Sequence, residues 1–479
     1  MKELNKTTVH KPLLPVKVLQ FGEGNFLRAF VDWMIDIANE RGVMHHGVVI
    51  VQPIDKGMTD ALNRQDDLYH VYLEGIRERK TVKEIRLVTC IQDAVNPYAE
   101  YDRYEHYFLT PGLETIISNT TEAGIRYEEG EDIFAEPPAS YPGKITALLY
   151  KRFKHFNGDP ERGLTVICCE LIENNGSTLR EHVLRHARAN RLEEAFVRWV
   201  NAHCRFCDTL VDRIVTGFPR ENIDEIKAEL GYNDNLVVKA EYYHLWAIGG
   251  AAHEEVRARF PLDRAGLHVL YMPDIKPFRD KKVRVLNGSH TAMVPVGLQL
   301  GCETVMDAFR NPLVERYINA LVAREVLPVI DEEREELESF AAGILERFYN
   351  PCIRHALRSI SLNSLSKWEA RNFPTVLDNL EKAGKVAEYS LFSLAALLVL
   401  YSGHAPVPFT PDDTPGHVAF IRQHWNNEEV ERGVREIIEN KQIWTVPLAS
   451  VPPLIPTVAK FARTILDEGM EQALTQLLS

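Results

Sequence analysis

The sequence predicts an α/β protein in which a doubly wound N-terminal domain precedes an all-helical C-terminal domain. Apolar runs of strand length alternate with helical patterns in the first half, which is the rhythm of α/β folds with a largely parallel sheet. This rhythm ends near residue 278, and long helical patterns follow. With 479 residues, the chain also exceeds the usual length of a single domain. We therefore predict one domain over residues 1–277 and a second over residues 278–479.

The apolar runs of the first half have the length of buried strands. They span residues 16–21, 47–52, 68–73, 85–91, 114–119 and 164–170. Helical patterns lie between several of them, notably over residues 145–156. In the second half, helical periodicity extends over residues 305–329, 331–347, 375–383, 390–402, 427–440 and 456–478. The second domain is therefore predicted to contain helices alone.

The first predicted strand ends in a glycine-rich turn, Phe21-Gly-Glu-Gly-Asn-Phe26, and a helical pattern follows it to about residue 39. Gly22 permits a tight turn, Gly24 lets the backbone approach a pyrophosphate, and the start of the helix offers unpaired N–H groups to the anion. Leu27 stands where the Gly-x-Gly-x-x-Gly pattern has its third glycine. The run predicts a Rossmann-like, NAD-binding first domain. Its predicted cofactor contacts are Phe21, Gly22, Gly24, Asn25 and Phe26.

Other strand ends are candidate cofactor contacts as well, because ligands of such folds bind at the carboxyl ends of the strands. The polar turns at residues 92–97 and 118–124 predict contacts from Asp93, Asn96, Thr121 and Glu122. At the end of the second strand, Gln52 or Asp55 would bond the ribose hydroxyls. No arginine is present there to receive a 2′-phosphate, which favours NAD, although Lys56 leaves NADP open.

Charge and apolar content exclude several classes of partner. The net charge is −13 and the basic runs are short, so we expect neither nucleic acid nor an anionic membrane surface as a partner. The N-terminus lacks an apolar signal core, and the most apolar stretch, residues 391–401, is too short to span a bilayer. We therefore expect a soluble, cytoplasmic protein with a small-molecule substrate. The oligomeric state stays open.

Cysteine usage predicts neither a disulfide framework nor a metal centre. The seven cysteines are an odd number, which argues against complete pairing. His203, Cys204 and Cys207 lie close together in the sequence, but a structural zinc site needs a second ligand pair at suitable spacing, and none is evident. We interpret these residues as structural and expect no bound metal.

A second motif, Lys282-Val-Arg-Val-Leu-Asn287-Gly-Ser-His290, gathers an amine, an amide and an imidazole on one predicted helix. At about 100° per residue, Lys282, Asn287 and His290 fall within an arc of roughly 140°. Oxidation of a secondary alcohol needs a base for the hydroxyl proton and hydrogen-bond donors for the developing oxyanion. The motif therefore predicts the catalytic site of a secondary-alcohol dehydrogenase.

The chain resembles the polyol-specific long-chain dehydrogenases, the mannitol dehydrogenase family. The Lys-x4-Asn-x2-His spacing and the opening Phe-Gly-x-Gly-Asn-Phe-x-Arg-Ala-Phe are similar to motifs of that family. Family-like segments also occur in order along nearly the whole chain, at residues 169–176, 209–214, 241–246 and 347–367. The resemblance implies an NAD-linked, metal-independent interconversion of a keto-uronate and the corresponding aldonate. Fructuronate reductase or a mannitol or other polyol dehydrogenase of the same family is the alternative.

A non-catalytic sensor that binds the dinucleotide is the alternative from another class. Such a sensor would have lost the base or its partners, and all three motif residues are intact here. In the family that the chain resembles, the motif lysine is the general acid/base, the asparagine helps to polarise the carbonyl and the histidine positions the substrate. Those roles would fall to Lys282, Asn287 and His290. Asn175 would complete the oxyanion site, although relatives also carry an asparagine where this chain has Leu171.

A sugar-acid substrate adds a carboxylate, which calls for a planar cation that binds it through two hydrogen bonds. Arg358 is the first candidate and Lys367 the second, and both lie in a polar run rich in serine and asparagine. Arg354 and Arg371 would be next.

Overall fold

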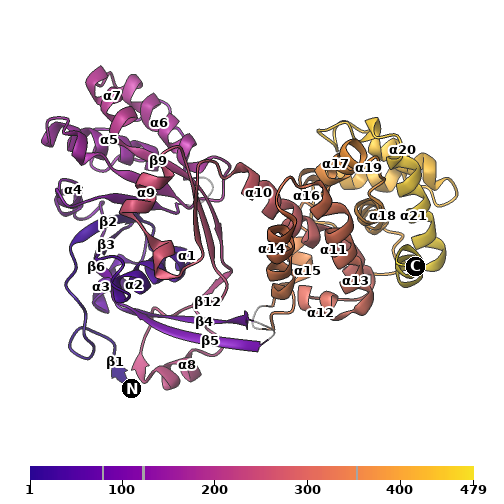
Figure 1. The fold of residues 1–479 in the computed structure, drawn as a ribbon, viewed down its shortest axis with the longest axis horizontal. Coiled ribbons are helices and arrows are strands. Elements are labelled where there is room, and N and C mark those ends of the chain that lie inside the picture. The colour runs from indigo at the N-terminus through magenta and orange to yellow at the C-terminus, as the bar shows by residue number, and fades with distance from the viewer. Residues whose placement is uncertain (78–79, 121–123, 352–353) are drawn as a thin grey trace. The chain divides into compact units, whose positions relative to one another are not determined.

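The computed structural model describes residues 1–77, 80–120, 124–351 and 354–479, and it divides into two compact units (Figure 1). The first unit comprises Met1–Gly75 and Thr81–Lys276, and the second comprises Ile76–Lys80 and Pro277–Ser479. The main division after Lys276 lies next to the boundary that the sequence predicts after residue 277. Assignment of the segment Ile76–Lys80 to the second unit has no counterpart in the sequence prediction.

The first unit contains an 8-stranded sheet in the order β14-β13-β9-β8-β7-β2-β3-β6. Its strands are β2 (Val16–Phe21), β3 (Gly47–Val51), β6 (Ile91–Val95), β7 (Thr115–Ser118), β8 (Thr165–Cys168), β9 (Arg205–Asp212), β13 (Leu245–Gly249) and β14 (Val269–Met272). The strands from β6 to β9 are parallel, and β13 runs antiparallel to β9. The order β6-β3-β2-β7-β8-β9 is that of doubly wound dinucleotide-binding sheets, with the reversal between β2 and β7. This confirms the predicted fold class.

Both faces of this sheet are buried, which explains why its central strands are almost continuously apolar. Val18 and Ile50 belong to one core, whereas their neighbours Leu19 and Val51 belong to the other, because successive side chains of a strand point to opposite faces. Helices α2 (Trp33–Glu40) and α9 (His253–Arg259) contribute to the first core. Helices α4 (Tyr101–Phe108), α5 (Tyr141–His155), α6 (Asn175–Ala189) and α7 (Glu194–His203) contribute to the second.

A smaller, 4-stranded sheet in the first unit has the order β10-β12-β4-β5. Its strands are β10 (Val215–Gly217), β12 (Val238–Glu241), β4 (Tyr69–Arg77) and β5 (Lys80–Val88), and short strands β1 (Lys2–Glu3) and β11 (Tyr232–Asn233) pair separately. The remaining elements are α1 (Asn25–Leu27), η1 (Arg28–Asp32), α3 (Thr59–Arg64), η2 (Pro160–Arg162), α8 (Ile223–Leu230) and η3 (Leu262–Ala265).

Two strand predictions differ from the structure for local reasons. The run predicted over residues 85–91 divides into β5 and β6, because the backbone N–H groups of Thr89 and Cys90 bond to the Asp36 carboxylate between them. The sequence predicts no strand between residues 170 and 278, yet β9, β10, β12, β13 and β14 lie there. In β9, buried positions alternate with half-buried ones that include Asp208 and Asp212, so no continuous apolar run exists.

The second unit is built from helices, as the sequence predicts. They are α10 (Lys276–Lys282), α11 (Ser289–Gln299), α12 (Val305–Arg310), α13 (Pro312–Leu321), α14 (Arg334–Arg347), α15 (Leu357–Ile360), α16 (Ser364–Arg371), α17 (Phe373–Ala383), α18 (Glu388–Ser402), α19 (Pro415–His424), α20 (Val430–Ile438), α21 (Leu454–Glu468) and α22 (Met470–Leu477). Shorter turns are η4 (Val283–Gly288), η5 (Val322–Val326), η6 (Leu327–Val329) and η7 (Leu448–Ser450). Among the described residues from 277 onward, the only β feature is an isolated bridge between Thr304 and Ala356.

Helix α18 forms the centre of this unit, and every residue from Tyr389 to Ser402 in it is buried. Its first turn has no cap of its own, and the carboxylate of Glu325 accepts hydrogen bonds from the backbone N–H groups of Tyr389 and Ser390 instead. Burial raises the pKa of Glu325 to about 7. No helix in the described part of the chain is long and apolar enough to cross a membrane.

Two long helices predicted from periodicity are each interrupted. The pattern over residues 305–329 breaks at Asn311, whose side chain accepts a hydrogen bond from the N–H of Leu313 and caps α13. The pattern over residues 456–478 breaks at Gly469, whose φ of +82° lies in the region that favours glycine. Periodicity reports which face is apolar, and it continues across a break when both helices bury the same face.

Candidate active site

The glycine turn of the first unit lies where the sheet order reverses. Gly22 has a φ of +127°, and a Cβ at this position would stand 3.0 Å from the carbonyl oxygen of Asn119 and 3.1 Å from Cδ1 of Leu27. The turn therefore needs glycine for both conformation and space. Leu27, at the place of the third glycine, fills the space beneath the turn. The side chain of Phe21 points into the core against Tyr141, so Phe21 contributes its backbone to the turn.

Arg28, which is only 2% exposed, holds the turn in shape from inside. Its Nε donates to the carbonyl of Glu23 at 3.0 Å, one Nη donates to Oδ1 of Asn25 at 2.8 Å, and the other donates to the carbonyl of Leu236 at 2.7 Å. The Asn25 side chain is therefore engaged within the turn. Sequence reasoning did not single out Arg28, although its place in the turn motif is the signal that could have done so.

The helical run after the turn offers its N-terminal N–H groups without a side-chain cap. Gly24 has extended backbone before α1, and a Cβ at Gly24 would meet nothing within 4 Å. The run continues through the π turn η1 into α2, with the Phe26 ring stacked on Phe30 at 4.9 Å. An uncapped helix start behind an open glycine is the arrangement that binds a phosphate group.

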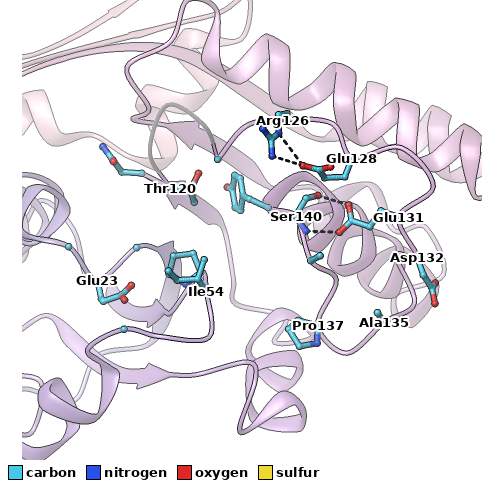
Figure 2. A pocket seen from close by; sticks show the side chains of 18 of the residues that line it. Glu23, Ile54, Thr120, Arg126, Glu128, Glu131, Asp132, Ala135, Pro137 and Ser140 are labelled. Carbon is cyan, nitrogen blue, oxygen red and sulfur yellow. Dashed lines mark hydrogen bonds and ion pairs between the residues drawn. The ribbon is translucent and has the colours of Figure 1, made fainter.

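A cavity of about 920 Å³ opens beside this turn (Figure 2). It is lined by the turn itself, the loop after β3, the end of β7 and the segment from Gly124 to Tyr141. Glu23 and Ile54 lie on one side, and Ser140 and Glu131, joined by hydrogen bonds, lie on the other. The cavity has the volume of a small-molecule site and lies where doubly wound sheets bind dinucleotides. The residues present therefore fit a dinucleotide.

The end of β3 is organised by Gln52, which is 2% exposed. Its Nε2 donates to the carbonyls of Ile54 and Asp55 at 2.9 and 3.1 Å, and its Oε1 accepts from the Thr59 hydroxyl at 2.9 Å. Asp55 is exposed at the tip of this loop. Neither predicted ribose ligand is among the residues that line the cavity within the described chain.

The remaining predicted cofactor contacts have local partners or fall outside the described residues. Asp93 bonds to Arg103, to the Tyr107 hydroxyl and to the N–H of Ala94. Asn96 accepts from the N–H of Tyr98 at 3.0 Å. Thr121 and Glu122 lie outside the described residues.

Asn175 is 1% exposed and joins the ends of β8 and β9. Its Nδ2 donates to the carbonyls of Cys168 and Glu170 at 3.1 and 3.0 Å and lies 3.3 Å from that of Thr209. Its Oδ1 accepts from the N–H groups of Gly176 and Thr209, both at 2.9 Å. The amide has no hydrogen-bonding capacity left for a reacting oxygen. The hydrogen bonds of Asn175 therefore support a structural role, and its oxyanion role stays a prediction.

In the second unit, the Lys282 motif forms one continuous helical run with a π turn inside it. Lys282 ends α10, Asn287 lies in the π turn Val283–Gly288, and His290 lies in the first turn of α11. A π turn holds one residue more than an α-helical turn, so each residue advances by less than 100°. The three side chains consequently lie within a narrower arc than the roughly 140° expected for a regular helix. All three are half-buried.

His290 is packed on two sides by rings. It stacks on Phe348 at 4.6 Å between ring centroids and meets His355 edge-on at 5.2 Å. Burial lowers the pKa of His290 well below its usual value, and the nearby charges of His355, Arg347 and Arg371 lower it further. The imidazole is therefore neutral at neutral pH, with one nitrogen able to donate and the other able to accept a hydrogen bond.

Positive charge gathers around His290. Arg347 directly precedes Phe348, and Arg371 donates to the hydroxyl of Thr291 at 3.2 Å. We call Lys282, Arg347 and Arg371 the cationic cluster, since all three are close enough to lower the pKa of His290. Two neighbouring cations are instead held by carboxylates, Lys281 by Glu332 at 2.5 Å and Arg284 by Asp378.

The two cations first predicted to bind the substrate carboxylate each donate to a backbone carbonyl. The exposed Arg358 donates to the carbonyl of Pro408 at 3.1 Å and lies over the ring of Phe409. Lys367 donates to the carbonyl of Ile360 at 2.9 Å. Burial and the nearby charge of Arg371, four residues later on α16, lower the pKa of Lys367, so this amine lies close to the cationic cluster.

Models of known protein families match both halves of the chain. A model of the mannitol dehydrogenase Rossmann domain matches residues 16–260, and one of the mannitol dehydrogenase C-terminal domain matches residues 274–466. The chain belongs to the mannitol dehydrogenase family. An altronate oxidoreductase from Bacillus subtilis is 41% identical over 99% of this chain and 98% of that protein. Another from Bacteroides thetaiotaomicron is 40% identical over the full length of both.

Solved structures show the same fold at lower identity. Substrate-free D-sorbitol dehydrogenase matches with a TM-score of 0.80 and 19% identity, covering 99% of this chain and 100% of the other. Pseudomonas fluorescens mannitol 2-dehydrogenase, in complex with NAD and D-mannitol, matches with a TM-score of 0.69 and 22% identity, covering 97% and 94%. As a member of the mannitol dehydrogenase family, this protein is a polyol or sugar-acid oxidoreductase that uses a nicotinamide dinucleotide. This confirms the predicted family and the choice of an enzyme over a sensor.

Proposed function

We propose that the protein interconverts D-tagaturonate and D-altronate with NAD, as a tagaturonate reductase, also called altronate oxidoreductase. The observation that carries the proposal is the full-length identity of about 40% to altronate oxidoreductases. The unit that contains the Lys282 motif also contains the cationic cluster that a sugar acid requires. Fructuronate reductase and mannitol or another polyol dehydrogenase remain the alternatives within the family.

Each motif residue has a separate role in the oxidation of the secondary alcohol and in the reverse reduction. Bound NAD supplies the hydride acceptor. Lys282 takes the hydroxyl proton when altronate is oxidised and returns it when tagaturonate is reduced. Asn287 and the neutral His290 direct hydrogen bonds at the same oxygen and stabilise the charge that develops on it.

The substrate carboxylate is assigned to Arg371; Arg347 is a second arginine whose charge reaches His290. Arg371 is held by Thr291, the neighbour of His290, so its guanidinium lies next to the motif. A planar guanidinium can hold a carboxylate through two parallel hydrogen bonds. Arg358 and Lys367, the candidates chosen from the sequence, are substituted as well, so that their variants can be compared with the Arg371 variant.

The preference for NAD over NADP is supported by the charge around the cavity of the first unit. Glu23, Glu128, Glu129, Glu131 and Asp132 line it, and the lining residue Arg126 is paired with Glu128. A 2′-phosphate would enter a field of mainly negative charge, which opposes its binding.

The decisive measurement is kcat/KM with NADH for tagaturonate, fructuronate and fructose. We expect tagaturonate to be preferred, and Arg371→Ala to reduce its advantage over fructose by about 10- to 150-fold, since a hydrogen bond to a charged group contributes about 1.5–3 kcal/mol. Arg358→Ala serves as the control and should leave the ratio unchanged, whereas Lys367→Ala tests whether the amine close to Arg371 also contributes. A wild-type preference for fructose would refute the sugar-acid assignment, and a preference for fructuronate would select the first alternative.

A further inference from the structure

Glu23, between the two glycines of the turn, places a carboxylate inside the cavity of the first unit. The residue is 9% exposed, and a Cβ on Gly57 would come within 2.2 Å of its Oε1. The carboxylate therefore lies against the loop after β3. Burial, the larger effect, raises the pKa of Glu23, and the backbone of Met58 lies close enough to lower it. Figure 2 shows Glu23 beside Ile54 of the same loop.

In many doubly wound folds, an acidic side chain in this region binds the adenosine ribose. In doubly wound folds, an Asp or Glu near the end of the second strand usually bonds the ribose hydroxyls. Here that strand is β3, and its end is occupied by Gln52, whose amide is already bonded to Ile54, Asp55 and Thr59. The carboxylate nearest to this place and inside the cavity comes from the glycine turn instead.

We propose that Glu23 selects NAD over NADP by accepting hydrogen bonds from the 2′- and 3′-hydroxyls of the adenosine ribose. This inference rests on the proposed use of the cavity by NAD, and it is independent of the sugar substrate. The same carboxylate repels a 2′-phosphate, because two anions would then meet in a partly buried place.

Two neighbours fix Glu23 in this role. Arg28 donates to its carbonyl at 3.0 Å and so holds its backbone. Gly57 leaves the space that the carboxylate occupies, and its backbone angles do not themselves require glycine. Two other acidic residues of the lining have side-chain partners: Glu131 bonds to Ser140 and Glu128 pairs with Arg126.

The test is the dissociation constant of NADH and of NADPH, measured by nucleotide fluorescence without any sugar. Glu23→Gln keeps an oxygen that can accept from Met58 and removes the charge. We expect the ratio of the NADPH to the NADH dissociation constant to fall at least about 10-fold, the effect of losing a charged hydrogen-bond acceptor. Asp55→Asn, which removes the exposed carboxylate of the same loop, is the matched control and should leave the ratio unchanged.

A purely structural role for Glu23 would weaken both nucleotides equally in Glu23→Gln, and that result would overturn the proposal. If Glu23→Gln does not fold, Gly57→Ala gives a second measurement. It displaces the carboxylate while keeping its charge, so NADH should lose more affinity than NADPH, and equal losses would contradict the proposal. A wild type that binds NADPH as tightly as NADH would refute the proposed cofactor itself. A wild type that prefers NADH while Glu23→Gln leaves the ratio unchanged would refute only the role of Glu23.

Discussion

The glycine turn of the first unit and the motif helix of the second use their side chains in opposite ways. In the turn region, Arg28, Gln52 and Asn175 direct their polar groups inward and bond to the protein's own backbone. What remains for a ligand there is a cavity with its acidic lining and an uncapped helix start. On the motif helix, the proposed chemistry is assigned to the side chains themselves. Under this proposal, recognition by the first region depends mainly on backbone shape, and recognition by the second depends on functional groups.

The two regions also differ in charge. Among the charged residues that line the cavity of the first unit, five are acidic and one is basic, whereas the motif of the second unit lies near the cationic cluster. A cofactor that must be released after each turnover and a substrate that carries a carboxylate place different demands on a site. The difference predicts that substitutions in the two regions will affect different kinetic constants.

The largest expected effect is on the motif helix. Lys282→Ala should reduce turnover at least about 100-fold, the low end for loss of a general acid/base, while the dissociation constant of NADH stays nearly unchanged. Lys281→Ala, which removes an amine already paired with Glu332, is the control and should retain most of its turnover. Steady-state kinetics with NADH titrations would test this, and near-normal turnover of Lys282→Ala would remove it from the mechanism.

A smaller effect is expected at the glycine turn, where two alanine variants separate folding from binding. Gly24→Ala adds a methyl group that meets no protein atom within 4 Å, so the melting temperature should not change. The methyl group would stand where a pyrophosphate approaches, and NADH affinity should fall about 10-fold or more. Gly22→Ala, at a φ of +127°, should lower both the melting temperature and the affinity. An unchanged NADH affinity in Gly24→Ala would show that the cofactor does not approach this turn.

Stability rather than activity should respond to Glu325, the cap of α18. Its pKa is raised to about 7 in the folded protein, compared with about 4.3 for an unperturbed glutamate. The folded state therefore holds a proton that the unfolded state releases, and this contribution to stability is lost as pH rises through about 7. Glu325→Gln does not titrate, so its melting temperature should gain a few degrees relative to wild type between pH 5 and pH 8. Glu338→Gln on the exposed face of α14 should show no such trend.

No effect is expected from removing metal ions, because the proton transfer assigned to Lys282 needs none. Turnover in excess EDTA should equal that in its absence. Loss of activity that zinc restores would replace the lysine mechanism with a metal-assisted one.

The sequence predicted the fold well where an element is a continuous apolar run. Strand β2 follows directly from such a pattern. The roles of Lys282, Asn287 and His290 rest on side-chain identity and spacing, and they stay predictions. The prediction was poorer where a polar side chain bonds to backbone that is distant in sequence. Asn175 reaches Thr209 in another strand, and no local pattern distinguishes that structural amide from one that is free to bind a substrate.

The choice of the cation that binds the substrate carboxylate is a second case in which contacts distant in sequence matter. Arg358 and Lys367 lie in a polar run that has the composition of a binding loop, and they donate to the carbonyls of Pro408 and Ile360. Their role in substrate binding stays a prediction. Arg371 was only a reserve candidate, because its proximity to His290 depends on how α16 packs against α11. Packing between helices is decided by the whole apolar core, and a single motif does not report it.

The π turn in the motif helix has a consequence for the spacing of the motif. A π turn holds one residue more than an α-helical turn within an otherwise continuous helix. In a regular α-helix, a lysine, an asparagine and a histidine would face one side with the spacing Lys-x3-Asn-x2-His. The extra residue is therefore part of the motif, and the same arrangement of groups corresponds to a different spacing on a regular helix.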